Sequence, residues 1–170
     1  AKMVTGTVAE RRQILAEADS EDILLTSYDL LKRDISEYEG YKFRCEIIDE
    51  AQYIKNANTQ AAKAVKEVQA DFRLALTGTP VENRLSELWS IFDYLMPGFL
   101  YSYKKFREEV EIPAVQNSDE DAMKRLQKMI RPFVLRRLKK EVLTDLPDKL
   151  EENMFVQLTG EAAEALLMHM

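Results

Sequence analysis

The first half of the chain alternates short apolar runs with segments whose apolar positions recur at helical spacing. The runs predicted to be strands are 2–5, 23–26, 43–49 and 72–77, and the predicted helices are 7–18, 29–38 and 59–68. Strands that alternate with helices are typical of a parallel sheet covered by helices. We therefore expect an α/β fold, with the polar residues that end each strand gathered at the edge where such sheets bind ligands.

After Pro80 the pattern predicts helices alone. An apolar stripe at helical spacing indicates a helix that begins after Asn83, its expected N-cap, and that stops at Pro97. Its members are Leu85, Leu88, Trp89, Phe92 and Leu95. The second half should therefore be helical where the first half is mixed.

Further helices are expected beyond this one. A short helix should run from Ser102 to Val110 and be followed by a polar break over 113–117. Another should open at Ser118, carry acids in its first turn and bases in its last, and end at Pro132.

The tail contains a break at Leu146-Pro147, a strand-like run over 152–158 and a helical pattern near Gly160. The chain begins with Ala1 inside a strand-like run and stops at Met170 inside a helical one. We therefore expect it to be a piece excised from a longer protein.

Composition restricts the class of protein. The chain has 46% hydrophobic residues over 170 positions, which suits a globular domain with a core. Its one cysteine, Cys45, excludes a disulfide framework and a cysteine-based zinc site, so a reduced, cytoplasmic setting is expected. No apolar run approaches the roughly 20 residues that span a bilayer, and no membrane partner is expected.

The charge is uneven along the chain. The net charge of -6 argues against a protein that coats nucleic acid with its whole surface. Between Lys124 and Lys140, however, eight basic residues occur without an acid. This stripe either grips nucleic acid or finishes and solvates a helix C-terminus, and the two interpretations have about equal weight.

The acidic pair Asp49-Glu50 follows the apolar strand 43–49. In nucleoside-triphosphate hydrolysis one carboxylate holds Mg²⁺, usually through its water shell, and a second orients the attacking water. Because neighbouring positions on a strand face opposite ways, a sharp turn after Asp49 is needed to bring both near one phosphate. Taken alone the pair is a weak signal, since many strands end in acidic turns.

A second apolar strand ends in Thr77-Gly78-Thr79-Pro80. Gly78 would allow close approach of the backbone, and Pro80 disfavours the helical conformation at Thr79. The two hydroxyls could relay hydrogen bonds from the carboxylates to whatever the protein grips. Taken alone, this loop is better explained as a plain strand-to-helix turn with threonine as a cap.

Together these segments resemble a known family. Asp49-Glu50-Ala51-Gln52 and 76–80 are similar to motifs II and III of superfamily-two helicase-like ATPases, and further stretches resemble the Swi/Snf family of double-stranded-DNA translocases. These stretches are Leu25-Thr26-Ser27-Tyr28, Lys55-Asn56, the residues from Asn83 to Pro97, and Arg131-Pro132-Phe133-Val134-Leu135-Arg136-Arg137 with Lys139, Val142, Leu146-Pro147 and Lys149. The resemblance runs in order from about residue 2 to residue 160.

The resemblance implies a fold and a set of roles. The fold would be a partial RecA-like parallel sheet flanked by helices, with an appended helical protrusion. Asp49 would associate with Mg²⁺ through water when ATP is bound, and Glu50 would be the general base or orient the water. Gln52 would couple nucleotide to nucleic acid, although many remodelling enzymes carry histidine there. Further roles are implied for Thr77, Gly78 and Thr79 in coupling, for Thr26 and Asn83 near nucleic acid, and for Arg136 and Arg137 in bracing two lobes.

The resemblance also implies an organisation and an activity. Residues 1–100 would be the back half of a first RecA-like lobe, 101–132 the protrusion, 133–150 a brace or linker, and 151–170 the start of a second lobe. The parent protein would use Mg-ATP and double-stranded DNA. No Gly-Lys-Thr phosphate loop occurs in the chain, so we expect the 170 residues alone to be inactive and to hold no tightly bound cofactor.

Two alternative functions and one structural expectation follow from the same residues. A strand-separating helicase is disfavoured by the segment from Arg131 to Lys149, which ordinary DEAD-box helicases lack. A non-catalytic scaffold would keep the fold and bind partners through the protrusion and the basic stripe. Finally, if the phosphate-loop strand normally lies beside strand 72–77, its loss leaves an apolar edge, through which we expect self-association or strand rearrangement.

Overall fold

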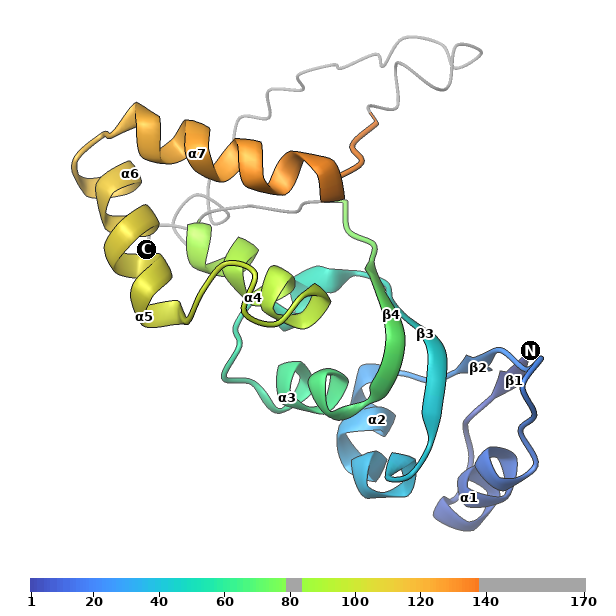
Figure 1. Cartoon of the computed structure of the whole chain (residues 1–170). Helices are drawn as coiled ribbons and strands as arrows, with labels where there is room; N and C mark the ends of the chain where they lie inside the picture. Colours follow the sequence, from blue (N-terminus) through green and yellow to red (C-terminus); the bar gives the residue numbers. More distant parts are fainter. Residues whose placement is uncertain (79–83, 138–170) are drawn as a thin grey trace, which may run out of the picture. The chain divides into compact units, whose positions relative to one another are not determined.

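The computed structural model describes residues 1–78 and 84–137 (Figure 1). The chain divides into one compact unit over residues 1–130 and a second over 131–170. Of the second unit the structure describes only 131–137, where η4 (Arg131–Phe133) is one 3₁₀ turn. The first unit contains the sheet, its helices and the expected protrusion, and it positions the acidic pair.

In the described residues the strands form two parallel pairs. β1 (Lys2–Met3) pairs with β2 (Leu24–Leu25), and β3 (Lys42–Ile48) pairs with β4 (Gln69–Ala75). Ile48 stands opposite Ala75 in the register, so β3 and β4 end level with each other. The chain therefore leaves both strands at the same edge, with the acidic pair on one and the threonine loop on the other.

The helices of the first half begin at hydroxyl caps. They are α1 (Val8–Ala16), α2 (Tyr28–Asp34) and α3 (Gln60–Glu67), capped by Thr7, Ser27 and Thr59. The helix predicted over 29–38 is regular only to Asp34 and then tightens into the 3₁₀ turn η1 (Ile35–Tyr38). These side chains satisfy amide groups that a helix start leaves without an intrahelical partner.

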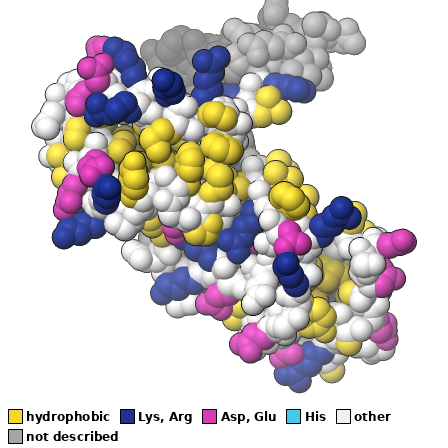
Figure 2. Space-filling model, in the orientation of Figure 1, with side chains coloured by type: hydrophobic (Ala, Val, Ile, Leu, Met, Phe, Trp, Pro, Cys, Tyr) yellow, Lys and Arg dark blue, Asp and Glu magenta, His cyan; other side chains and the backbone are white. Residues whose placement is uncertain are grey.

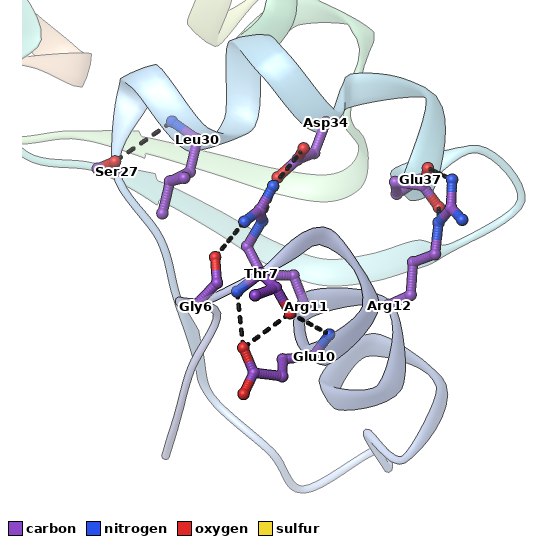
Figure 3. A network of polar contacts seen from close by, with 9 residues as sticks. All are labelled: Gly6, Thr7, Glu10, Arg11, Arg12, Ser27, Leu30, Asp34 and Glu37. Atoms are coloured by element: carbon purple, nitrogen blue, oxygen red, sulfur yellow. Dashed lines mark hydrogen bonds and ion pairs between the residues drawn. The ribbon is translucent and has the colours of Figure 1, made fainter.

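A buried ion pair fastens α1 to α2 (Figure 3). The Arg11 guanidinium donates to both carboxylate oxygens of Asp34, with 2.7 Å between Nη2 and Oδ1, and it also donates to the carbonyl of Gly6. This hydrogen bonding holds the pKa of the Asp34 carboxyl below its usual value. Arg12 makes a second two-pronged pair with Glu37, so α1 is held to the chain that leads into β3.

Helix α4 (Leu85–Leu95) serves two cores. Ile91 and Tyr94 pack in the core beneath the strands, whereas Leu88 and Phe92 pack in a second core with Phe106 of the protrusion. Its N-cap is Arg84, in extended conformation and without a side-chain cap, whereas the sequence predicted Asn83. Asn83 itself lies outside the described residues.

The protrusion differs from its sequence pattern in two places. One continuous helical segment runs through α5 (Tyr103–Phe106), the π-helical turn η3 (Arg107–Glu111) and α6 (Ile112–Gln116), so Pro113 does not begin a break. The wider turn accommodates a proline, which offers no amide and crowds the preceding turn. Helix α7 (Glu120–Ile130) is capped by Asp119, whose Oδ1 accepts from the amides of Asp121 and Ala122, and not by Ser118.

One face of the strands is covered and the other is open. The covered face of the β3–β4 pair carries Ile48, which belongs to the hydrophobic core that the strands share with the helices. The opposite face exposes large apolar side chains: Ile47, Phe72, Leu74 and Leu76, joined on the other strand pair by Met3, Ile23 and Leu25. Hydrophobic side chains open to the surface are visible in Figure 2.

Candidate functional site

The acidic pair stands in a sharp turn directly after β3. Asp49 and Glu50 are both exposed, and Glu50 adopts a left-handed conformation with φ 51° and ψ 53°. A residue other than glycine pays roughly 1–2 kcal/mol for this conformation. The turn that the sequence required after Asp49 is therefore present, and it brings both carboxylates out at the strand end.

Three hydrogen bonds hold this turn. The Glu50 amide donates to Asp49 Oδ1 at 2.8 Å, and the Tyr28 hydroxyl donates to the Asp49 carbonyl at 2.8 Å. The Ala51 amide donates to the carbonyl of Leu76 at 2.9 Å, which ties the exit of the turn to the end of β4. The strained conformation persists because neighbouring elements bind it on both sides.

Gln52 joins the acidic turn to the threonine loop. It lies in the 3₁₀ turn η2 (Ala51–Ile54), and its Nε2 donates to Glu50 Oε2 at 2.7 Å. Its Oε1 accepts from the Thr77 hydroxyl at 2.9 Å. The amide orientation follows from chemistry, since an ionised carboxylate can only accept. Glu50, Gln52 and Thr77 thus form one hydrogen-bonded chain across the ends of β3 and β4.

The carboxylate of Asp49 suits a hydrated cation. It is exposed at the end of a parallel strand, and its Oδ1 accepts a hydrogen bond from the Glu50 amide. Within residues 1–78 and 84–137 no group of three or more histidine, cysteine or acidic side chains is arranged to hold a metal ion directly. The predicted role of Asp49, which is to hold Mg²⁺ through its water shell, does not require such a group and stays a prediction.

The other predicted site residues are placed in part. Thr26 is exposed directly after β2. Gly78 is exposed after β4, and a Cβ built on it would meet nothing within 4 Å. Thr79, like Asn83, lies outside the described residues. Arg136 and Arg137 are exposed and belong to the second unit, so their bracing role stays a prediction.

The basic stripe is partly engaged within its own helix. Lys124 pairs with Glu120 and Asp121 on α7 at 3.2 and 3.8 Å, and Arg125 lies 4.0 Å from Asp119. Lys124, Arg125, Glu120 and Asp121 are solvent-exposed, and Asp119 is partly buried. This part of the stripe behaves as a solvated helix face, where such pairs add little to stability.

Three polar features of the site were not anticipated from the sequence. Tyr28 was noted only as part of a motif, yet its hydroxyl reaches the acidic turn. Ser90 on α4 donates to the carbonyl of Ile54 at 2.6 Å and anchors η2 from below. The third feature is the pair Glu46 and Arg73, which stand opposite each other in β3 and β4. Charged residues inside two otherwise apolar runs were the available signal for this pair.

None of the helices in the described part of the chain combines the length and the apolar composition needed to cross a bilayer. A recess of about 490 Å³ in the described residues is lined by Lys42, Gln69 and Asp71 among others. It lies where β3 and β4 begin, at the end away from Asp49.

Several known proteins are similar in sequence to this chain. The chain is 42% identical over 162 residues to an uncharacterized ATP-dependent helicase of Mycoplasma genitalium, covering 94% of this chain and 15% of that relative. It is 40% identical over 174 residues to the TATA-binding protein-associated factor MOT1 of Saccharomyces cerevisiae, covering 96% of this chain and 9% of that relative. The chain thus spans a small fraction of the curated relatives it matches.

A solved structure shows the same fold. The SWI2/SNF2 ATPase core of Sulfolobus solfataricus, solved in complex with double-stranded DNA, matches with a TM-score of 0.67 at 44% identity, over 85% of this chain and 31% of that one. The expected RecA-like α/β fold is confirmed by this match. The model of the SNF2-related domain matches residues 3–167. The chain therefore belongs to the SNF2-related domain family.

Proposed function

We propose that the chain is the part of an ATP-dependent double-stranded-DNA translocase that carries the acidic residues of ATP hydrolysis. One observation carries the proposal: a hydrogen-bonded chain from Glu50 through Gln52 to Thr77 links the ends of two neighbouring parallel strands. Membership of the SNF2-related family and the likeness to a DNA-bound ATPase core support it. The reaction and the DNA partner belong to the longer protein.

The acidic turn has the residues for the hydrolytic step. Asp49 would hold Mg²⁺ through its hydration water, and the ion would neutralise charge on the phosphates. Glu50 would orient the attacking water and accept its proton, because its carboxylate is exposed and its position is fixed by Gln52. Glu50 stands in the left-handed turn that follows β3, next to Asp49.

Coupling would pass through the threonine loop. A change at Glu50 during hydrolysis reaches Thr77 through Gln52. Gly78 and Thr79 would continue this link toward the bound nucleic acid, with Thr26 and Asn83 near its backbone. Arg136 and Arg137 would brace the two lobes.

The general-base assignment can be tested in the complete protein. Glu50→Gln keeps the shape and the capacity to accept a hydrogen bond but cannot take a proton. We expect ATP turnover to fall about 10²–10⁴-fold while nucleotide binding is retained. Glu39→Gln, in the exposed residue before Gly40, is the matched control. Turnover that survives in Glu50→Gln would show that another group is the base.

Translocation is separable from strand separation. A protein that tracks duplex DNA should displace a third strand from a triplex when ATP is supplied and should leave the duplex intact. Unwinding of the duplex would favour a strand-separating helicase. Full binding to DNA without ATP turnover would favour the scaffold. For the isolated 170 residues we expect no turnover, since the sequence lacks a phosphate loop.

Two further proposals concern the chain itself. Parallel sheets are normally covered on both faces, whereas here one face of β3 and β4 is apolar and open. We propose that the isolated chain self-associates through the edge of β4 that no described strand pairs with, and through this apolar face beside it. We also propose a cytoplasmic setting, which the lone, exposed Cys45 supports.

A further inference from the structure

Tyr28 reaches the acidic turn from the helix that follows β2. It is the first residue of α2, two positions after Thr26 at the end of β2, and its helix is anchored by the Ser27 hydroxyl, which accepts from the Leu30 amide at 3.3 Å. From there its own hydroxyl donates to the carbonyl of Asp49 at 2.8 Å. The end of β2 and the end of β3 are thus joined by one side chain.

The bond falls on the peptide group that sets the two carboxylates. This peptide links Asp49 to Glu50: Tyr28 binds its carbonyl, and the Asp49 carboxylate binds its amide at 2.8 Å. Since Glu50 is held in a left-handed conformation, rotation of this peptide would redirect both side chains. Tyr28 therefore acts on the direction of the carboxylates without touching them.

The tyrosine is held firmly for this role. Its ring stacks on Tyr53 in η2, with centroids 5.4 Å apart and planes 28° apart. Its hydroxyl is the donor of the 2.8 Å bond to the Asp49 carbonyl. Donor and acceptor are thus matched, because the Asp49 carbonyl can only accept.

We propose that Tyr28 is a positioning residue through which the segment that ends β2 sets the direction of Asp49 and Glu50. The proposal rests on the proposed function for its consequence: nucleic acid bound near Thr26 would promote hydrolysis by steadying α2 and, through Tyr28, the acidic turn. The hydroxyl would then matter for turnover in the presence of DNA and little for nucleotide binding.

The test is Tyr28→Phe in the complete protein, with Tyr41→Phe as the matched control at the opposite end of β3. In Tyr28→Phe we expect the DNA-stimulated kcat to fall about three- to tenfold, the effect of one net hydrogen bond, with the KM for ATP and the Kd for DNA within about twofold of the wild type. Tyr41→Phe should match the wild type. An unchanged kcat, or a rise in the KM for ATP with kcat retained, would overturn the proposal.

A second measurement does not depend on activity. Hydrogen–deuterium exchange of the peptide that spans residues 46–55 reports on the Ala51 amide, which the turn holds against Leu76. Faster exchange there in Tyr28→Phe, but not in Tyr41→Phe, supports the positioning role even if the protein shows no DNA-stimulated turnover and the proposed function fails. Equal exchange in all three proteins would overturn the positioning role whatever the turnover.

Discussion

Glu46 on β3 and Arg73 on β4 stand opposite each other beneath the strands, with Glu46 Oε2 3.3 Å from Arg73 Nε. The distance is that of an ion pair, yet among the described residues neither atom has a hydrogen-bond partner. Arg73 instead donates to the carbonyls of Lys66, Val68 and Tyr94. The Arg73 guanidinium is thus held by hydrogen bonds, whereas the cost of burying the Glu46 carboxylate is only weakly offset by Arg73.

This arrangement predicts an unusual pH dependence. Burial raises the pKa of Glu46 to about 7 from an ordinary value of 4.5, although Arg73 opposes the shift. A raised pKa means that the folded chain binds the proton more tightly than the unfolded chain. The contribution of Glu46 to stability is therefore full below about pH 4.5 and is lost as the pH rises through about 7.

Glu46→Gln should remove this dependence. Relative to the wild type, we expect the variant to gain about 1–3 kcal/mol in free energy of unfolding between pH 4.5 and pH 7.5, measured by urea denaturation at each pH. The difference between the two proteins isolates Glu46 from acids such as Asp34, whose lowered pKa acts in the opposite direction at lower pH. Parallel profiles for the two proteins would show that Glu46 is charged in the folded state near neutrality.

The strand order along the chain was predictable from sequence, because apolar runs and helical periods alternate clearly. The strand boundaries were harder to predict. β3 begins at Lys42 and β4 at Gln69, because polar residues at the start of a strand can still pair in the ladder. The helix break at Pro113 was wrong because a π-helical turn absorbs the proline. Proline marks a helix boundary only where the preceding turn is regular.

The residues of the site could be predicted from the sequence, but the hydrogen bonds that join them could not. An acidic pair at a strand end indicated the need for a turn, and Glu50 supplies it. The contacts from Tyr28 and Ser90 join positions 21 and 36 residues apart in sequence. Local pattern carries no information on which hydroxyl meets which carbonyl over such separations, because that depends on how helices pack against the sheet.

Ser90 should matter for stability out of proportion to its size. It is 1% exposed, and its hydroxyl binds the carbonyl of Ile54, a fully buried residue at the end of η2. Ser90→Ala leaves that carbonyl without its donor, so we expect a loss of about 1–3 kcal/mol in the free energy of unfolding. Ser86→Ala, half-buried on the same helix, should change it by less than about 0.5 kcal/mol. Equal effects of the two substitutions would contradict the anchoring role.

Gln52 and Thr77 should behave as one unit in the complete protein. Gln52→Ala removes both hydrogen bonds of the amide, and Thr77→Val removes the hydroxyl that binds it. If both act through the same chain from Glu50, each should lower DNA-stimulated ATP turnover and the double variant should be little worse than Gln52→Ala. A double-mutant cycle of kcat values measures this directly. Additive losses would mean that the two residues act independently.

The open face of the β3–β4 sheet should govern association of the isolated chain. Ile47, Phe72 and Leu74 are 59, 68 and 52% exposed, and within the described residues no strand pairs with the far side of β4. A second copy would remove this apolar surface from water, so we expect a monomer–dimer equilibrium in sedimentation experiments at rising concentration.

The double substitution Ile47→Glu and Leu74→Glu places like charges on opposite residues of the face and should shift the equilibrium to monomer. Val115→Glu, 62% exposed on α6, adds a charge elsewhere and should leave association unchanged. A wild-type chain that stays monomeric at high concentration, or dimers that persist in the double variant, would exclude this face as the contact.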